Sequence, residues 1–236
     1  MDIKEEGLIG DINNHWYYRG KLAALHRMLP AEGPNRILDV GAGSGFFAES
    51  LLQSTNARVA TCVDHDYPEN RDDARTGKPL LFRQSIVQSD ADLVLMMDVI
   101  EHVGDDAGLV REYADKVASG TRFIVSVPAF MWLWSSHDVF LGHYRRYTLT
   151  EIESVLRSAG LIIECGCYFY GAVLPIVALA RVKWAKPSDD KPRSQMREFG
   201  PLLNTTFWFA CRTELHFFRA NRLAGLTAFI RAVKSG

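Results

Sequence analysis

The chain has 236 residues, a formal net charge of -1 at pH 7, and 47% hydrophobic and 23% charged residues. This length suits one well-packed domain and is short for two, and the composition is that of an ordinary globular protein. The near-neutral charge and the lack of a separate nucleic-acid-binding module argue against a nucleic-acid partner. We therefore expect a single domain over residues 1–236.

The first eleven residues are polar and acidic and contain no signal-peptide core. The longest nearly uncharged run, residues 165–180, is shorter than the roughly 20 apolar residues that a membrane span needs. We therefore expect a cytoplasmic protein without a membrane-spanning helix.

Predicted helices and strands alternate along the chain. A helix at 15–29 belongs to an amino-terminal helical cap, residues 1–34, and a strand at Arg36–Val40 runs into a glycine-rich turn and a helix at 46–53. The other predicted strands are 58–63, 80–86, 91–99, 121–127, 161–170 and 226–233, and the other helices are 107–118 and 150–159. Thr148 or Thr150 is the predicted N-cap of the last of these helices, and Gly160 ends it. The pattern predicts an α/β fold, Rossmann-like and doubly wound, with a mostly parallel seven-stranded sheet covered by helices on both faces.

Residues 172–222 form a predicted helical insertion before the last strand. Two helices rich in large apolar side chains are separated by the polar linker 186–192, and 11 basic but only 4 acidic residues follow residue 180. Apolar faces with basic edges are typical of a lid over a lipid-like ligand, a peripheral membrane contact or a partner-binding face. Packing against the core or in a homodimer is the alternative, and the sequence leaves monomer and homodimer open.

A glycine-rich turn, Gly41-Ala42-Gly43-Ser44-Gly45, lies between the first strand and its helix. Glycine lets the backbone approach a ligand closely, and the helix amino terminus directs its N–H groups at the same place. A nicotinamide-binding domain has a related loop, but its last glycine would fall at Phe46. Asp64 ends the second strand, where a carboxylate can accept both ribose hydroxyls of an adenosine.

Three ordered segments carry a family resemblance. Leu38–Gly45 (LDVGAGSG) resembles motif I of class I S-adenosylmethionine (SAM)-dependent methyltransferases, and Met97–Val103 (MDVIEHV) resembles the segment after their fourth strand. Val127–Thr148, ending in HYRRYT, is similar to a bacterial subgroup related to the ubiquinone-biosynthesis methyltransferases. The resemblance implies SAM as cofactor and S-adenosylhomocysteine as product.

The resemblance also implies a set of cofactor-binding residues. Its glycine turn lines the methionine half of SAM, Asp64 holds the ribose, Asp98 faces the methionine end and Met97 packs near the adenosine. A guanidinium from Arg19 matches the SAM carboxylate, or is a solvated helix charge. The full set of implied cofactor residues is Arg19, Asp39, Gly41, Ala42, Gly43, Gly45, Asp64, Met97 and Asp98.

Glu101, His102 and His143 are the predicted catalytic residues. Methyl transfer needs alignment above all, and a base helps when the acceptor is a weakly acidic hydroxyl. The three residues resemble the metal site of small-RNA and ubiquinone methyltransferases, in which mixed carboxylate and imidazole ligands hold a divalent metal. A metal site, a metal-free histidine base and a purely structural role remain three alternatives.

Aromatic residues are dense around these motifs. They predict an apolar wall for a small-molecule acceptor that is aromatic or lipid-like, free or tethered to a carrier, and methylated on oxygen. The predicted acceptor-binding residues are Trp16, Tyr17, Trp132, Trp134, His137 and Arg145. The same rings equally fit a role in covering the sheet.

Two functions from other classes compete with methyl transfer. A nicotinamide-dependent oxidoreductase would share the first strand, turn and helix, but would leave the segments from Asp98 to Thr148 unexplained. A non-catalytic SAM-binding protein would bind the cofactor and turn over no acceptor.

Overall fold

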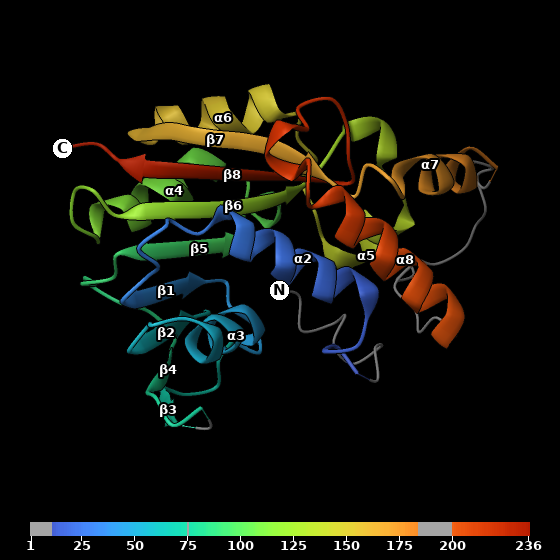
Figure 1. Ribbon diagram of the computed structural model, residues 1–236. Helices are drawn as coiled ribbons and strands as arrows, with labels where there is room; N and C mark the ends of the chain where they lie inside the picture. Colours follow the sequence, from blue (N-terminus) through green and yellow to red (C-terminus); the bar gives the residue numbers. More distant parts are fainter. Residues whose placement is uncertain (1–10, 75, 184–199) are drawn as a thin grey trace.

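An eight-stranded sheet forms the centre of the computed structural model, which describes residues 11–74, 76–183 and 200–236 (Figure 1). The strand order is β3-β4-β2-β1-β5-β6-β8-β7. The strands are β1 (Arg36–Val40), β2 (Val59–Val63), β3 (Arg71–Asp73), β4 (Leu80–Arg83), β5 (Leu93–Met97), β6 (Arg122–Pro128), β7 (Leu161–Phe169) and β8 (Thr227–Lys234).

Five adjacent strands, β4, β2, β1, β5 and β6, run parallel, whereas β8 is antiparallel to both β6 and β7. The direction in which successive strands are added reverses between β1 and β5: β2 and β4 lie on one side of β1, and β5 and β6 lie on the other. Ligands of open α/β sheets bind beyond the carboxyl ends of the strands at such a reversal. The carboxyl ends lie on the right in Figure 1.

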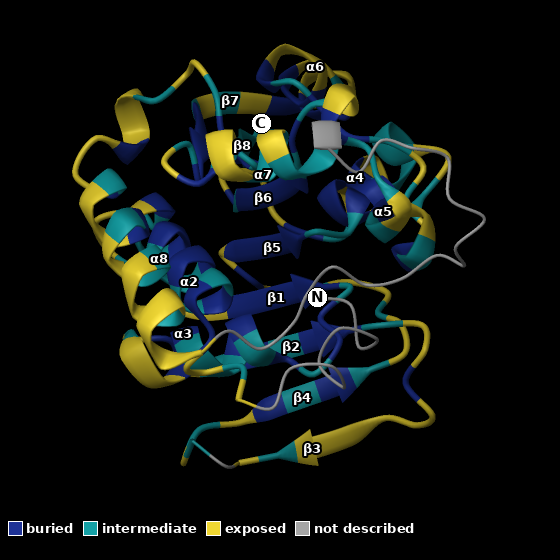
Figure 2. Cartoon of the chain, turned by 90° about the vertical axis from the view of Figure 1, so that its right-hand side faces the viewer, coloured by how far each residue is buried: buried dark blue, intermediate teal, exposed yellow. Residues whose placement is uncertain are grey.

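The predicted doubly wound α/β fold is confirmed, but the predicted number of seven strands is wrong. The additional strand is β3, which pairs antiparallel with β4 at the edge of the sheet and is largely exposed (Figure 2). Its three residues, Arg71, Asp72 and Asp73, are all charged. The apolar alternation by which a strand is recognised in a sequence is therefore missing.

Helices cover both faces of the sheet. The helices α2, α3 and α8 share one buried apolar cluster with one face, and α4 and α6 share a second cluster with the other (Figure 2). The helices are α2 (Trp16–Met28), α3 (Phe46–Ser54), α4 (Asp106–Asp115), α5 (Ser136–Leu141), α6 (Leu149–Ser158), α7 (Leu174–Lys183) and α8 (Pro201–Glu214), with short 3-10 turns η1 (Ile100–His102), η2 (Met131–Leu133) and η3 (Phe218–Ala220).

The helix α6, Leu149–Ser158, begins and ends one residue before the predicted helix 150–159. Thr148, one of the two predicted N-caps, forms a capping box with Glu151: its hydroxyl accepts the Glu151 backbone N–H, and its own N–H donates to the Glu151 carboxylate. Gly160 follows the last turn with a φ of 85°, a conformation that glycine adopts without steric cost.

The predicted insertion contains α7 and α8, between β7 and β8, while the linker 186–192 lies outside the described residues. The helix α8 packs against α2: the Asn204 side-chain oxygen accepts a hydrogen bond from the Trp16 N–H at 2.8 Å, and the Phe207 and Trp16 ring centroids are 5.1 Å apart. Among the described residues, every helix is too short or too polar to cross a membrane.

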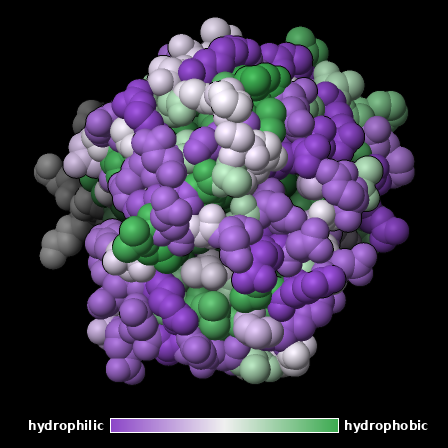
Figure 3. All heavy atoms as spheres, turned by 90° about the vertical axis from the view of Figure 1, so that its left-hand side faces the viewer, coloured by the Kyte–Doolittle hydropathy of each residue, from purple (hydrophilic) through white to green (hydrophobic). Residues whose placement is uncertain are grey.

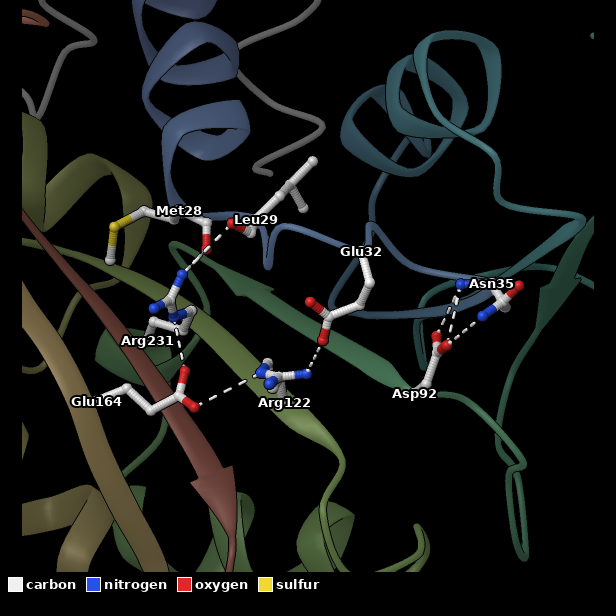
Figure 4. A network of polar contacts seen from close by, with 8 residues as sticks. All are labelled: Met28, Leu29, Glu32, Asn35, Asp92, Arg122, Glu164 and Arg231. Carbon is white, nitrogen blue, oxygen red and sulfur yellow. Dashed lines mark hydrogen bonds and ion pairs between the residues drawn. The ribbon is translucent and has the colours of Figure 1, made fainter.

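The amino ends of the parallel strands are tied together by polar contacts (Figure 4). Arg231 on β8 pairs with Glu164 at 2.6 Å and donates to the carbonyls that end α2, and Arg122 on β6 pairs with Glu32 at 2.6 Å. The Asp92 carboxylate accepts the Asn35 N–H at 3.0 Å just before β1. The surface at this edge is mostly hydrophilic, with separated apolar patches (Figure 3).

Candidate active site at the carboxyl edge of the sheet

The glycine-rich turn follows β1 at the reversal point of the sheet. Gly41 has a φ of 62°, and a Cβ there would lie 2.7 Å from a methyl carbon of Val99. Gly45 has a φ of 83° at the N-cap of α3, where a Cβ would lie 3.1 Å from the Cys62 sulfur. Glycine is therefore required at both positions, and the amino terminus of α3 is directed at the space above the turn.

Asp64 lies beside this turn, just beyond β2. Its carboxylate accepts hydrogen bonds from the N–H of Gly43 at 3.1 Å and from the N–H of Asp66 at 3.0 Å. The Tyr67 hydroxyl donates to the Gly43 carbonyl at 2.6 Å and fixes the turn from below. The predicted ribose carboxylate and the predicted glycine turn thus meet in space.

Asp39, inside β1, is 1% exposed, and its Oδ2 has no hydrogen-bond partner within the described part of the chain. Burial raises the pKa of this carboxyl to about 7, and the nearby Asp64 charge acts in the same direction. Beside it in the turn, Ala42 is 2% exposed. A buried polar atom without a partner is uncommon in a structural role and is typical of a binding site.

Asp98, directly after β5, has a φ of 56° and forms an ion pair with Lys21 from α2, in which the Lys21 side chain is fully buried and that of Asp98 is 26% exposed. The Ser126 hydroxyl donates to the second Asp98 oxygen at 3.1 Å, and the Lys21 ammonium also bonds the Tyr17 hydroxyl at 2.9 Å. Burial alone would raise the pKa of Asp98, but the charge and hydrogen bond of Lys21 outweigh it and lower that pKa. The same contacts raise the pKa of Lys21 although burial opposes them, so the pair is ionised.

Glu101, His102 and His143 converge near Asp98. One ligand atom from each of the three lies within 4.8 Å of the others, and the two imidazole rings meet edge to face at 4.7 Å between centroids. A hydrogen bond from the Tyr144 N–H to the Glu101 carbonyl, at 2.7 Å, joins the two segments. Burial, followed by the Asp98 charge, raises the pKa of Glu101 well above its ordinary value, which favours the protonated form of this carboxyl.

The Glu101 carboxyl is fully buried, and neither oxygen has a hydrogen-bond partner within the residues that the structure describes. Carboxylate and imidazole groups at this spacing could hold a divalent cation such as Mg²⁺, Mn²⁺ or Zn²⁺. A protonated Glu101 could instead donate a hydrogen bond to a ligand oxygen.

Asp138 in α5 orients His143. Its fully buried carboxylate accepts hydrogen bonds from His143 Nδ1 at 3.0 Å, Arg146 Nε at 2.7 Å and the Ser135 N–H at 2.8 Å. Burial acts to raise the pKa of Asp138, but the hydrogen bonds from His143 and Arg146 lower it well below its ordinary value. An ionised Asp138 favours the His143 tautomer that carries its proton on Nδ1, which leaves the Nε2 lone pair available as a base.

The residues predicted on the amino-terminal helix take several positions. Trp16 is 7% exposed and packs edge to face on Tyr170 at 5.7 Å, while Tyr17 stacks on the same ring at 5.0 Å. The Arg19 guanidinium lies over the Trp208 ring of α8, 4.3 Å from its centroid. The structure brings Tyr17 to the Lys21–Asp98 pair, and it places Trp16 and Arg19 between α2 and α8.

The remaining predicted residues surround the carboxyl edge. Met97 is 1% exposed at the end of β5, and Trp132 is 61% exposed and stacked on Phe130 at 5.8 Å. Trp134 and His137 are half-buried on either side of the start of α5. Arg145 is held by Asp106 at 2.9 Å and by the Gly104 carbonyl at 2.8 Å, so its guanidinium is committed to the protein.

Lys21 and Asp138 belong to the site, yet sequence reasoning missed both. Lys21 lies four residues before Leu25 and seven before Met28, on the buried stripe of α2, where a cation needs a buried partner. Asp138 follows Ser135 in a capping box, a pattern that marks the start of a helix. These two signals were present in the sequence, but neither names the partner across the fold.

The observed residues fit a SAM molecule. The required glycine at position 41, the directed amino terminus of α3 and the unpartnered Asp39 oxygen all lie at one edge. A dinucleotide or an adenosine derivative with a charged tail is the kind of ligand that such an edge accepts.

Several known proteins are similar to this chain in sequence or in fold. The model of the methyltransferase-domain family matches residues 14–165. A probable SAM-dependent methyltransferase of Mycobacterium tuberculosis is 27% identical over 174 residues, which cover 68% of this chain and 61% of that protein. A ubiquinone biosynthesis O-methyltransferase of Yersinia pestis is 33% identical over 134 residues, covering 47% of this chain and 54% of the relative.

The chain therefore spans little more than half the length of these relatives. Among solved structures, a SAM-dependent methyltransferase from Mesorhizobium loti superposes with a TM-score of 0.57 at 17% identity, over 95% of this chain and 100% of that one. This likeness supports the fold, while the family model covers well over half of the sequence. The chain belongs to the methyltransferase-domain family, among the class I members whose cofactor is S-adenosylmethionine.

Proposed function

We propose that this chain transfers the methyl group of SAM to an oxygen of a small apolar, aromatic or lipid-like acceptor. The observation that carries the proposal is the meeting of the glycine turn and Asp64 with the oriented His143 at one edge of the sheet. SAM supplies a methyl group already activated on a sulfonium, so the protein has to bind, align and exclude water.

Each side of the site has a separate task in this proposal. The turn from Gly41 to Gly45 and the Asp39 carboxyl bind the methionine half, and Asp64 exchanges its hydrogen bond with Gly43 for the ribose hydroxyls. The Asp98 carboxylate bounds the same half and is held in place by Lys21, whose ammonium is committed to Asp98 and to the Tyr17 hydroxyl.

His143 removes the acceptor proton. Because Asp138 accepts the Nδ1 proton, Nε2 faces away from it as the basic atom. Burial favours the protonated form of Glu101, which in this proposal donates a hydrogen bond to an acceptor oxygen, and the His102 ring contacts the His143 ring edge to face. A divalent cation on these three residues is the competing arrangement, in which the metal would lower the acceptor pKa instead.

The acceptor class rests on the walls of the site and on one relative. Trp132 and Tyr144 expose aromatic surface in the segment that leads to and contains His143, and Trp134 and His137 are half-buried at the start of α5, the helix of Asp138. The Yersinia relative is named for O-methylation in ubiquinone biosynthesis, which supports an aromatic hydroxyl with an apolar tail. In this proposal the described helices of the insertion, α7 and α8, cover such a tail, free or attached to a carrier.

Calorimetric titration with SAM and S-adenosylhomocysteine, with and without Mg²⁺ or Zn²⁺, tests the proposal. We expect micromolar binding, roughly -8 kcal/mol. Asp64→Ala should weaken binding about 100-fold, because a charged acceptor of hydrogen bonds is lost. Asp66→Ala, an exposed neighbour, is the matched control.

Each alternative gives a different titration. Equal affinity in Asp64→Ala and the normal protein would refute the ribose assignment. Binding of NADH but not of SAM would establish the oxidoreductase, and SAM binding without turnover of any acceptor pool would establish the non-catalytic protein. Turnover that requires a metal would replace the metal-free base by the metal site.

A further inference from the structure

Arg181, on the last turns of α7, is a partly buried cation, and two of its three guanidinium nitrogens have no acceptor among the described residues. Its Nε and Nη1 atoms are inaccessible to solvent, and neither has a hydrogen-bond partner within the described residues. Burial, and then repulsion by Arg146, lower the pKa of Arg181 from 12.5 to about 10, which still leaves it charged at neutral pH. An unpaired buried charge is destabilising, so such a group is retained where a ligand supplies the missing partner.

The helix α7 directs Arg181 inward. Val177 packs against the apolar cluster beneath the helix, and Arg181, four residues later, lies on the same face. Ile176 and Leu179, on the opposite face, are 58% and 62% exposed. Figure 1 places α7 beyond the same end of the sheet as α5, which carries Asp138.

Among the described residues, the charged groups that act on Arg181 do not neutralise it. Asp138 and Arg146 both act electrostatically on it, so the three groups share one region. Both Asp138 oxygens already accept hydrogen bonds, from His143, Arg146 and Ser135. Asp138 is balanced by Arg146, so among the described residues Arg181 is an excess positive charge within electrostatic reach of the residue that orients the proposed base.

We propose that Arg181 binds an anionic oxygen group, a carboxylate or a phosphate, carried by the methyl acceptor. This rests on the proposed function, because the anion is placed near His143 as part of the substrate. A guanidinium presents several N–H donors in a plane, which suits these oxyanions better than a single ammonium does. Acceptors that lack the anion leave Arg181 unpaired and are bound more weakly.

Ligand-observed NMR with benzoate, phenyl phosphate and benzamide tests the proposal without requiring cofactor or turnover. We expect the intact protein to bind at least one of the two anions at least tenfold more tightly than the neutral amide. The ratio of benzoate to phenyl phosphate affinity identifies the anion. Arg181→Gln should remove the preference, and Arg181→Lys should keep part of it, whereas Arg212→Gln, an exposed arginine of α8, should retain it in full.

Thermal unfolding of ligand-free Arg181→Met gives a second readout. Removal of an uncompensated buried charge should raise Tm by about 2–4 °C. A fall in Tm of that size, or an unchanged anion preference in Arg181→Gln, would overturn the proposal. An anion preference that depends on Arg181 in a protein that fails to bind SAM would leave the anion site standing and refute the methyltransferase proposal.

Discussion

The two edges of the sheet differ in how completely their charged side chains are paired. At the amino edge, Arg122 and Arg231 are paired with carboxylates in a surface network (Figure 4). At the carboxyl edge, the carboxyls of Asp39 and Glu101 are buried with oxygens that have no partner within the described residues. Polar groups are thus satisfied where the protein needs only stability, and unsatisfied where it needs a ligand.

Backbone conformation separates the edges in the same way. The three non-glycine residues with positive φ within the described chain are Asp98, Phe130 and Tyr170, which follow β5, β6 and β7. All three strands end at the carboxyl edge, so the left-handed conformations cluster there. Such conformations persist only where surrounding contacts enforce them, and they are typical of sites that trade stability for function.

The largest expected effect is on the buried ion pair. Lys21→Met should lower the free energy of unfolding by about 3–5 kcal/mol, because Asp98 is left as an unpaired buried charge. Denaturant titration measures the loss, and Lys21→Met combined with Asp98→Asn should recover most of it. If Lys21→Met lowered the free energy of unfolding by less than about 1 kcal/mol, the pair would contribute no more than the surface ion pairs of the amino edge.

His143→Ala should lower methyl transfer by roughly 100-fold, since a general base is removed. Release of S-adenosylhomocysteine in the presence of a catechol or a small-molecule extract measures the effect. SAM affinity should be unchanged, and His216→Ala, an exposed histidine after α8, should leave both quantities unchanged. Weaker SAM binding in His143→Ala would show that His143 contacts the cofactor and not the acceptor.

Stability should fall as pH rises from about 4 to about 7 because of Asp39. The unfolded carboxyl loses its proton near its ordinary pKa of 3.8, whereas the buried one keeps its proton up to a pKa of about 7. Between these values the folded state binds more protons, so each step up in pH favours unfolding. Urea titrations from pH 4 to 8 should show this slope, on the order of 4 kcal/mol in total, with a shallower one for Asp39→Asn. Equal slopes in the normal protein and in Asp39→Asn would show that Asp39 does not cause the pH dependence of stability.

The smallest expected effect lies at the amino edge. Arg122→Gln removes two ion pairs of a partly exposed side chain, to Glu32 at 2.6 Å and to Glu164 at 3.5 Å. Surface pairs are weak, so Tm should shift by less than about 2 °C and the shift should vanish in 1 M salt. A larger or salt-independent shift in Tm would show that the ion pairs of the amino edge contribute as much to stability as the Lys21–Asp98 pair of the carboxyl edge.

Local sequence signals predicted most of the fold. The strand Arg36–Val40 has the predicted bounds, because a run of apolar residues ends at a glycine turn. The insertion and the capped helix α6 were also predicted. The polar edge strand β3 and the short helix α5, of six residues, were not predicted, because neither is long or apolar enough to give a periodic signal.

The site was predictable only in part. The glycine turn and Asp64 follow neighbouring strands, so the topology brings them together. Lys21 meets Asp98 across 77 positions of the chain, and Asp138 meets Arg146 and His143 through a helix start. Such pairings depend on packing geometry, which residue spacing does not encode.

The first turn of α2 is capped from a distance. The His15 side chain makes no cap hydrogen bond, and the Trp16 N–H instead bonds Asn204, 188 positions later in the chain. Undocking α8 would therefore fray the turn that carries Tyr17 and loosen the hold on Lys21. Docking of the inserted helix and integrity of the ion pair become one cooperative event, so hydrogen exchange of the α2 amides should report the state of α8.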